Sequence, residues 1–269
     1  MKEEKNMILV TGGTGFVGHK ILELCDNTVA APSLRGMSET DIARMVEESG
    51  ADTIVHTAAI SDIGTCQGDP EASWLANVQI PVYLAKAAKG RKLICFSSDQ
   101  VYSGMETEGP YTEESVKPAN SYAEHKLLME QKVLDLVPEA VMLRAEWMYD
   151  YYTKRANYFM QILNATESVS FSSRQFRGVT YVREVAQNME AVTRLPGGAY
   201  NFGSETGKSM YAITEEFLAA IGKNIRLEDA PPRNNLWMNC QKAAKLGVRF
   251  SKVEDGLKAC AEDYGLLIK

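Results

Sequence analysis

The sequence predicts an α/β fold, a doubly wound parallel sheet with a small C-terminal lobe, from three observations. Apolar runs with the length of buried strands alternate with segments whose apolar residues recur at helical spacing. The first of these runs leads straight into a glycine-rich turn and then into a helix, the order in which a parallel α/β sheet begins. Beyond Arg144 the alternation becomes irregular, which predicts a second, smaller unit.

The glycine turn lies within residues 7–18, which read Met-Ile-Leu-Val-Thr-Gly-Gly-Thr-Gly-Phe-Val-Gly. Gly12 allows a sharp turn, Gly15 allows a phosphate to approach without a Cβ in the way, and Gly18 allows the helix to pack close to the strand. The N-terminus of the helix presents free N–H groups and a positive dipole to an anion. The turn therefore predicts a pyrophosphate site of the Rossmann type, although such glycines could also form a βα turn without a ligand.

The other elements follow from hydrophobic spacing and from residues that start or stop helices. Ser38 is a suitable N-cap for one helix, while Gly90 and Pro138 limit two others. Short apolar strands separated by helices are typical of a parallel sheet covered on both faces. Strands are predicted over residues 8–10, 28–31, 52–56, 92–96, 140–143 and 199–202. Helices are predicted over residues 16–24, 38–49, 70–89, 122–136 and 182–194, with irregular strand and loop over 168–180.

Composition and charge narrow the class of protein. The chain has 269 residues, of which 45% are hydrophobic and 24% are charged, as in ordinary soluble proteins. Its net charge of −6 argues against a nucleic-acid-binding surface. No apolar run reaches the roughly 18 residues that a membrane span needs. The charged start of the chain leads directly into a strand, so we expect no signal peptide and a cytoplasmic location.

The spacing of cysteines and histidines indicates no metal site. Five cysteines are scattered along the chain without a Cys-x-x-Cys pair, which predicts reduced thiols. The three histidines lie far apart in the sequence and have no metal-ligand spacing. Metal chemistry is therefore not expected.

Two further signals lie at the ends of later elements. The fourth predicted strand is followed by Ser98, and the helix after it begins with Tyr122 and Lys126, one turn apart on the same face. An ammonium near a phenol lowers the phenol's pKa from its usual ~10. Such a Tyr can exchange a proton with a sugar or alcohol oxygen, a Ser hydroxyl can hold that oxygen, and a nicotinamide would supply hydride. The Tyr122 and Lys126 pair alone could be an ordinary helix start. Its position after the glycine turn and the strand that leads to Ser98 favours a catalytic role.

Together these residues resemble the extended short-chain dehydrogenase/reductases, and within them the dTDP-4-dehydrorhamnose reductase group of sugar-nucleotide enzymes. The glycine turn matches the family's cofactor loop, and Ser98, Tyr122 and Lys126 match its catalytic residues. The remaining matches are His56-Thr-Ala-Ala59, Asn77, Arg144-Ala-Glu-Trp147-Met-Tyr149 and Arg177-Gly-Val-Thr180. The resemblance covers nearly the whole chain.

The resemblance implies roles for individual residues. It implies catalysis by Ser98, Tyr122 and Lys126. Cofactor contacts are expected from Gly12, Thr14, Gly15, Phe16, Val17, Gly18, Arg35, Ala58, Ala59 and Asn77. Contacts with the sugar are expected from Asp99, Tyr102, Trp147 and Arg177, although Trp147 could equally be a core aromatic residue.

The chain departs from the family's pattern in two places. Residues 63–67 read Ile-Gly-Thr-Cys-Gln, so they lack both acids of the usual Val-Asp-x-Cys/Ala-Glu, and contacts made by those carboxylates cannot be carried over. Residues 31–35 read Ala-Pro-Ser-Leu-Arg, without the acid that holds the adenosine ribose. NAD loses its 2′-hydroxyl partner there, whereas Ser33 or Arg35 could accept a 2′-phosphate. NADP is therefore favoured, with NAD as the alternative.

Three functions remain open from the sequence. The first is an NAD(P)-dependent reductase of a nucleotide-linked 4-keto-deoxysugar. The second is an NAD-dependent sugar-nucleotide epimerase of the same superfamily, and the third is a non-catalytic nucleotide-binding regulatory subunit. A dehydratase is disfavoured because Asp99-Gln100 follows Ser98 where a dehydratase carries an acidic pair.

The expected organisation has two parts. An NAD(P)-binding domain is expected over residues 1–145 together with about 181–204, and a substrate-binding lobe over about 146–180 and 205–269. The lobe should close over the carboxyl edge of the sheet, where ligands of open α/β sheets bind. The expected small-molecule partner is a sugar nucleotide, with no nucleic acid or membrane partner. The resemblance also implies a homodimer through helices that flank the sheet.

Overall fold

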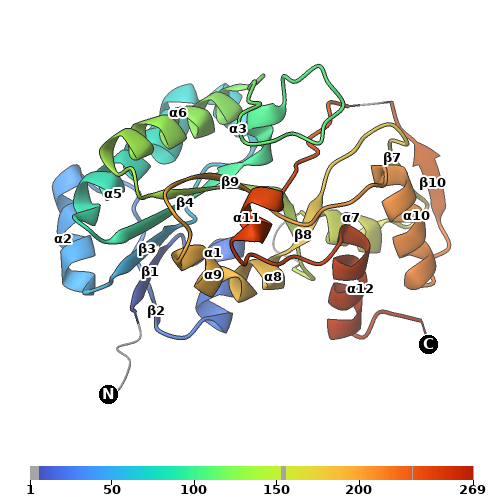
Figure 1. Ribbon diagram of the computed structural model, residues 1–269. Coiled ribbons are helices and arrows are strands. Elements are labelled where there is room, and N and C mark those ends of the chain that lie inside the picture. The colour runs from blue at the N-terminus through green and yellow to red at the C-terminus, as the bar shows by residue number, and fades with distance from the viewer. Residues whose placement is uncertain (1–5, 153–155, 232, 269) are drawn as a thin grey trace.

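The computed structural model describes residues 6–152, 156–231 and 233–268. Its centre is a sheet of six parallel strands in the order β2-β1-β3-β4-β5-β9 (Figure 1). The strands are β1 (Ile8–Thr11), β2 (Thr28–Ala30), β3 (Thr53–His56), β4 (Lys92–Ser98), β5 (Val141–Ala145) and β9 (Gly198–Phe202). The predicted α/β fold and all six predicted strands are confirmed. Because the strand order reverses at β1, a crevice for a ligand is expected at the carboxyl ends of β1 and β3.

Side chains of the central strands alternate between two apolar layers. Leu9 and Ile54 point into one layer, and Val10 and Val55 point into the opposite one. Helices α2, α5 and α6 cover the first layer and α1, α8 and α9 cover the second, as Figure 1 shows. These helices are α1 (Phe16–Leu24), α2 (Glu39–Ser49), α5 (Ile80–Ala88), α6 (Ser121–Leu136), α8 (Val182–Gln187) and α9 (Met189–Thr193). Burial on both faces explains why the strands are apolar throughout.

The predicted helix signals are present at α2. The Ser38 hydroxyl accepts a hydrogen bond from the backbone N–H of Asp41, and the Asp41 carboxylate accepts one from the backbone N–H of Ser38, so the two form a capping box. Gly50 follows the helix with a φ of 63°, the left-handed conformation that glycine adopts readily. Local sequence therefore determines both ends of this helix.

The helix predicted over residues 70–89 is interrupted in its middle. Helix α4 (Pro70–Trp74) passes into a π turn, η1 (Leu75–Gln79), before α5 begins. Pro81 has no N–H to donate to the carbonyl four residues earlier. The chain widens at this point, and the N–H of Ile80 reaches the carbonyl of Leu75 instead.

The remaining elements form a smaller layer beside the carboxyl edge of the sheet (Figure 1). Two short parallel pairs, β6 with β8 and β7 with β10, give it a framework. Its core is rich in aromatic residues, among them Tyr149, Tyr158, Phe159 and Phe217. The elements are β6 (Trp147–Tyr149), β7 (Ser168–Phe171), β8 (Val179–Tyr181), β10 (Arg226–Asp229), α7 (Tyr158–Asn164), α10 (Met210–Ala220) and α12 (Val253–Asp263). Three short helices complete the described chain: α3 (Ile63–Gly68), η2 (Asp99–Tyr102) and α11 (Gln241–Lys245).

The cysteine thiols are free and mostly enclosed. Cys66, Cys95, Cys240 and Cys260 are buried, and Cys25 is partly buried. Burial raises the pKa of Cys95 to about 12, which keeps that thiol protonated. Within the three described ranges, no helix is long and apolar enough to cross a membrane.

Candidate active site

A cavity of about 1010 Å³ runs along the carboxyl ends of the central strands. The glycine turn after β1 and the segment after β3 line one end. Ser98 at the end of β4, with Tyr122 and Lys126 from α6, line the middle. Residues 145–148 and Arg177 line the other end. Segments far apart in the sequence thus meet around one space that is large enough for two ligands.

The glycines of the turn are required by close backbone contacts. Gly12 has a φ of 74°, and a Cβ at this position would lie 2.7 Å from the backbone nitrogen of Ala58. A Cβ at Gly18 would lie 2.4 Å from the carbonyl oxygen of Gly12, which explains the close packing of α1. Gly15 is the N-cap of α1, and no side chain caps this helix end. The first N–H groups of α1 are therefore available to an anion.

Five residues of the predicted cofactor loop line the cavity, and Gly18 lies behind it. The lining residues are Gly12, Thr14, Gly15, Phe16 and Val17. Ser33 and Arg35 line the same end, where the backbone N–H of Arg35 donates to Ser33 Oγ at 3.4 Å. The carboxyl groups that line the cavity, Asp99 and Glu146, come from the opposite end. This end is therefore suited to a phosphate rather than to a free ribose hydroxyl.

Ala58 and Ala59 line the cavity, whereas Asn77 does not. The Asn77 side chain is fully buried, and its Nδ2 donates to the carbonyl of Ile60 at 2.9 Å. Its Oδ1 accepts from the N–H of Ile60 at 3.2 Å. The structure thus places the Asn77 amide outside the cavity lining, where it holds the loop that carries Ala58 and Ala59.

Ser98, Tyr122 and Lys126 meet in the middle of the cavity. The hydroxyl of the neighbouring Ser97 donates a hydrogen bond to Glu130. The Ser98 hydroxyl instead lies beside Asp99, another residue that lines the cavity, with 3.2 Å between Ser98 Oγ and Asp99 Oδ1. Lys126 Nζ lies 5.9 Å from the centre of the Tyr122 ring and donates to the carbonyl of Phe96 at 2.7 Å.

Lys126 is 2% exposed, and its burial lowers the pKa of its ammonium to about 8. The negative charge of the nearby Glu130 opposes that shift. The amine is thus held in one position, close to the ring it is expected to influence, and can lose its proton near neutral pH.

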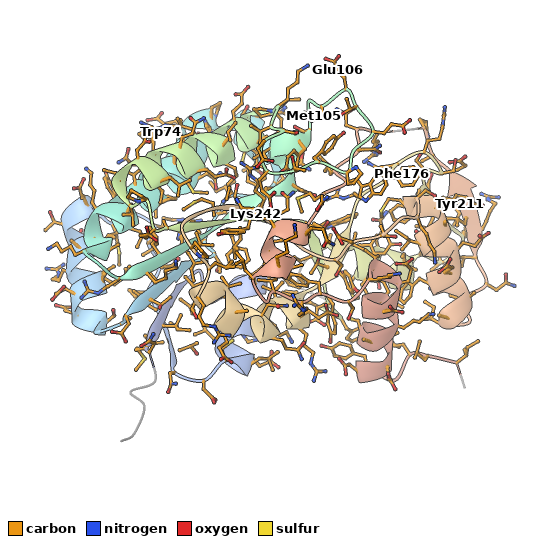
Figure 2. The ribbon with its side chains drawn as sticks, in the orientation of Figure 1. Trp74, Met105, Glu106, Phe176, Tyr211 and Lys242 are labelled. Atoms are coloured by element: carbon orange, nitrogen blue, oxygen red, sulfur yellow. The ribbon has the colours of Figure 1, made fainter. Side chains whose placement is uncertain are left out.

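Asp99, Trp147 and Arg177 gather at the far end of the cavity. Arg177 Nη2 lies 2.5 Å from Asp99 Oδ2, and its guanidinium carbon lies 5.4 Å from the centre of the Trp147 ring. Burial raises the pKa of Asp99, and the charge of Arg177 opposes that shift. Phe176, labelled in Figure 2, stacks on Trp237 with 5.3 Å between ring centres and so anchors the segment that carries Arg177.

Tyr102 does not belong to this group. It is fully buried, its hydroxyl donates to Asn201 Oδ1 at 2.6 Å, and it accepts from Arg144 Nη1 at 3.0 Å. The 3-10 turn of η2 directs Tyr102 into this internal network and away from the cavity. The structure therefore places the Tyr102 hydroxyl in a buried network and not in the cavity where a sugar contact is expected.

Comparison with known proteins places the chain in a family. The sequence pattern of the RmlD substrate binding domain matches residues 6–258. The chain belongs to this family. The resemblance read from the motifs is thereby confirmed.

Relatives of this RmlD-family chain include proteins of two kinds. A dTDP-4-keto-6-deoxy-D-glucose reductase of Streptomyces niveus is 27% identical over 76% of this chain and 74% of the relative. The methionine adenosyltransferase 2 subunit beta of Xenopus laevis is 29% identical over 89% of this chain and 82% of the relative. The structure of Bacillus anthracis dTDP-4-dehydrorhamnose reductase in complex with NADP has a TM-score of 0.85 at 18% identity, over 96% of this chain and 99% of that chain. This last likeness shows the shared fold.

Among the lining residues of this RmlD-family site that lay outside the predicted set is one carboxyl, Glu146. It is 7% exposed and lies next to Trp147, at the end of a fully buried strand. Burial raises the pKa of its carboxyl to about 8. The sequence indicates this residue by an acid at the carboxyl end of a buried strand, because acidic side chains are rarely fully buried unless they have a partner.

Proposed function

We propose that the protein is an NADPH-dependent reductase of a nucleotide-linked 4-keto-deoxysugar. The observation that carries the proposal is the single cavity that joins the glycine turn to Ser98, Tyr122 and Lys126. A dinucleotide site and a proton donor are useful together only if a hydride acceptor lies between them. The curated relatives that reduce dTDP-linked keto sugars support this substrate class.

The residues at one end fit a nicotinamide dinucleotide phosphate. The turn over Gly12 to Gly15 leaves room for a pyrophosphate, and the open N-terminus of α1 offers N–H donors to it. Ser33 and Arg35 would hold the 2′-phosphate, which favours NADP over NAD. Lys126 would hold the nicotinamide ribose. When bound, the nicotinamide supplies the hydride.

The middle of the cavity would handle the proton. Tyr122 would donate a proton to the 4-keto oxygen as it gains charge, and Ser98 would hydrogen bond to the same oxygen. Lys126, fixed by Phe96, would orient the ribose and the phenol. At the far end Asp99, Trp147 and Arg177 would seat the sugar.

The organisation of the chain belongs to the same proposal. Residues 1–145 with about 181–204 would bind NAD(P), and about 146–180 with 205–269 would form the substrate lobe. The aromatic core around Tyr149, Tyr158 and Phe159, separate from the two cores of the central sheet, supports this division. A homodimer through the helices that flank the sheet is part of the proposal, and light scattering of the purified protein tests it.

The test is the oxidation of NADPH with dTDP-4-keto sugars. We expect loss of NADPH absorbance and formation of the 4-hydroxy sugar nucleotide. Binding of NADPH without any turnover of a 4-keto sugar nucleotide would contradict the proposal. Interconversion of two sugar nucleotides without net NADPH consumption would indicate an epimerase instead.

A second candidate is a non-catalytic subunit of another enzyme. The likeness to the methionine adenosyltransferase 2 subunit beta favours it, as does the absence of acids at residues 63–67. The presence of Ser98, Tyr122 and Lys126 in one cavity argues against it. A dinucleotide that binds but is never oxidised, together with capture of a partner enzyme, would favour this second candidate.

A further inference from the structure

Glu146 is a buried carboxyl that the proposed reductase mechanism leaves without a role. It follows β5 directly, and the preceding Ala145 pairs with Ser98 of β4. Glu146 is one of the residues that line the same cavity as Ser98, Asp99 and Tyr122. Glu146 therefore lies one strand away from the place where the reacting carbonyl would bind.

The protein leaves a fitted space for this carboxyl. A Cβ at Gly178 would lie 2.1 Å from Glu146 Oε1, and a Cβ at Gly203 would lie 2.2 Å from Oε2. Gly178 precedes β8 and Gly203 follows β9, so two separate segments make room for it. Any other residue at either position would displace the carboxyl.

A chain of hydrogen bonds fixes the role of one oxygen. The backbone N–H of Ser204 donates to Thr180 Oγ1 at 2.9 Å, and the Thr180 hydroxyl donates to Glu146 Oε2 at 2.8 Å. Oε2 is thus an acceptor. When the carboxyl is protonated, Oε1 carries the proton.

Charged and titratable groups surround Glu146 from several elements. The charge of Asp99, in η2, raises the pKa of the Glu146 carboxyl, and the charge of Arg177, before β8, lowers it. The Cys240 thiol, next to α11, stays protonated because burial raises its pKa. Burial of Glu146 is the largest influence, and it brings the pKa of the carboxyl to about 8. Most molecules therefore carry a neutral acid here at pH 7.

We propose that Glu146 determines sugar specificity by hydrogen bonding to a ring hydroxyl next to the carbonyl held by Ser98 and Tyr122. The inference rests on the proposed reductase function, because it needs a sugar in the cavity. A neutral carboxyl both donates and accepts, as a hydroxyl does, whereas a carboxylate only accepts and would repel the diphosphate of the substrate. A sugar without this hydroxyl would leave the buried carboxyl without a hydrogen-bond partner. A polar pocket discriminates most strongly against an analogue of this kind.

The experiment measures binding by calorimetry between about pH 6.5 and about pH 9. The probes are dTDP-glucose, its ring-deoxy analogues and dTDP alone, with the wild-type protein and Glu146→Gln. In the wild type we expect the Kd for dTDP-glucose to rise about tenfold from pH 7 to pH 9, since the acid form is lost as the pH passes about 8. The Kd for dTDP should change much less. One deoxy analogue should bind about 10- to 100-fold more weakly at pH 7.

The Gln variant keeps a donor and an acceptor but cannot ionise. We expect it to bind dTDP-glucose at pH 7 within about threefold of the wild type and to show no rise in Kd with pH. Glu190→Gln, at a side chain that is 84% exposed, is the matched control and should behave as the wild type. Glu146→Leu should bind all sugar analogues equally, and thermal unfolding checks that it folds. If it does not fold, the pH profile of the Gln variant decides.

Two results would overturn the inference, and they have different meanings. A pH-dependent Kd that persists in Glu146→Gln, or equal affinity of wild type for every deoxy analogue, would contradict the role of Glu146 alone. A wild-type protein that binds NADPH but no dTDP-sugar at any pH would contradict the reductase proposal as well.

Discussion

The two ends of the cavity are built in different ways. At the cofactor end, a short continuous stretch around Gly12, Gly15 and Gly18 forms the turn, and the loop at Ala58 and the segment of Ser33 and Arg35 complete it. At the sugar end, Asp99, Glu146 and Arg177 come from three distant segments and meet only in the folded protein. The first end is local and depends on backbone shape, whereas the second depends on side-chain charge and burial.

This difference predicts that substitutions at the two ends have different consequences. Backbone contacts at the glycine turn allow almost no substitution, because a Cβ would meet main-chain atoms. Side chains at the sugar end can be exchanged one at a time without altering the turn. Substitutions at each end, and at the proton donor between them, should therefore affect cofactor binding, sugar binding and turnover separately.

Tyr122→Phe should have the largest effect, because it removes the proton donor that joins the two ends. We expect kcat to fall by about 10²-fold or more, with little change in the Kd for NADPH. Steady-state rates and fluorescence titration measure the two quantities. Tyr211→Phe, on the surface helix α10 (Figure 2), is the matched control. Retained turnover in Tyr122→Phe would place the proton donor elsewhere.

Gly18→Ala should damage the cofactor end. The new Cβ would lie 2.4 Å from the main-chain oxygen of Gly12, so α1 has to shift. We expect a loss of about 1–3 kcal/mol in the free energy of unfolding and NADPH binding about tenfold weaker or worse. Gly207→Ala, where a Cβ meets nothing within 4 Å, should change neither value. Equal behaviour of the two variants would show that the turn is not constrained as described.

Arg177→Met should act on the sugar end alone. The substitution removes the ion-pair partner of the buried Asp99 carboxyl. Removing one partner of a buried ion pair lowers the free energy of unfolding by about 3–5 kcal/mol. We expect the lower end of this range because Arg177 is partly exposed. The KM for the sugar nucleotide should rise about tenfold while the Kd for NADPH stays the same. Adding Asp99→Asn should restore part of the stability. A matching loss of NADPH affinity would mean that the two ends are not independent.

Arg35→Ala should have the smallest effect, because Arg35 is an exposed side chain at the cofactor end. We expect the preference for NADPH over NADH in kcat/KM to fall by up to about tenfold, with activity on NADH unchanged. Measuring both cofactors with one sugar nucleotide tests this. An unchanged ratio would assign the 2′-phosphate to another group.

The backbone contacts of the glycine turn could be predicted from the sequence, whereas the positions of Tyr102 and Glu146 could not, for a physical reason. Spacing within one turn determines the contacts of Gly12 and Gly18, so a linear pattern is enough. The direction of Tyr102 depends on a 3-10 turn, which sends the side chain to Asn201. The importance of Glu146 depends on two glycines more than thirty residues away, and no local pattern reports them.

The proposal that one cavity brings NADPH and a keto sugar together can be tested by the transfer of a labelled hydride. The protein would be mixed with a dTDP-4-keto-deoxysugar and NADPH deuterated on the transferable position of the nicotinamide. We expect the deuterium to appear on the carbon that was the ketone and Tyr122→Phe to suppress this transfer. Product formed without deuterium, or bound NADPH that keeps its label in the presence of every 4-keto sugar nucleotide, would contradict it.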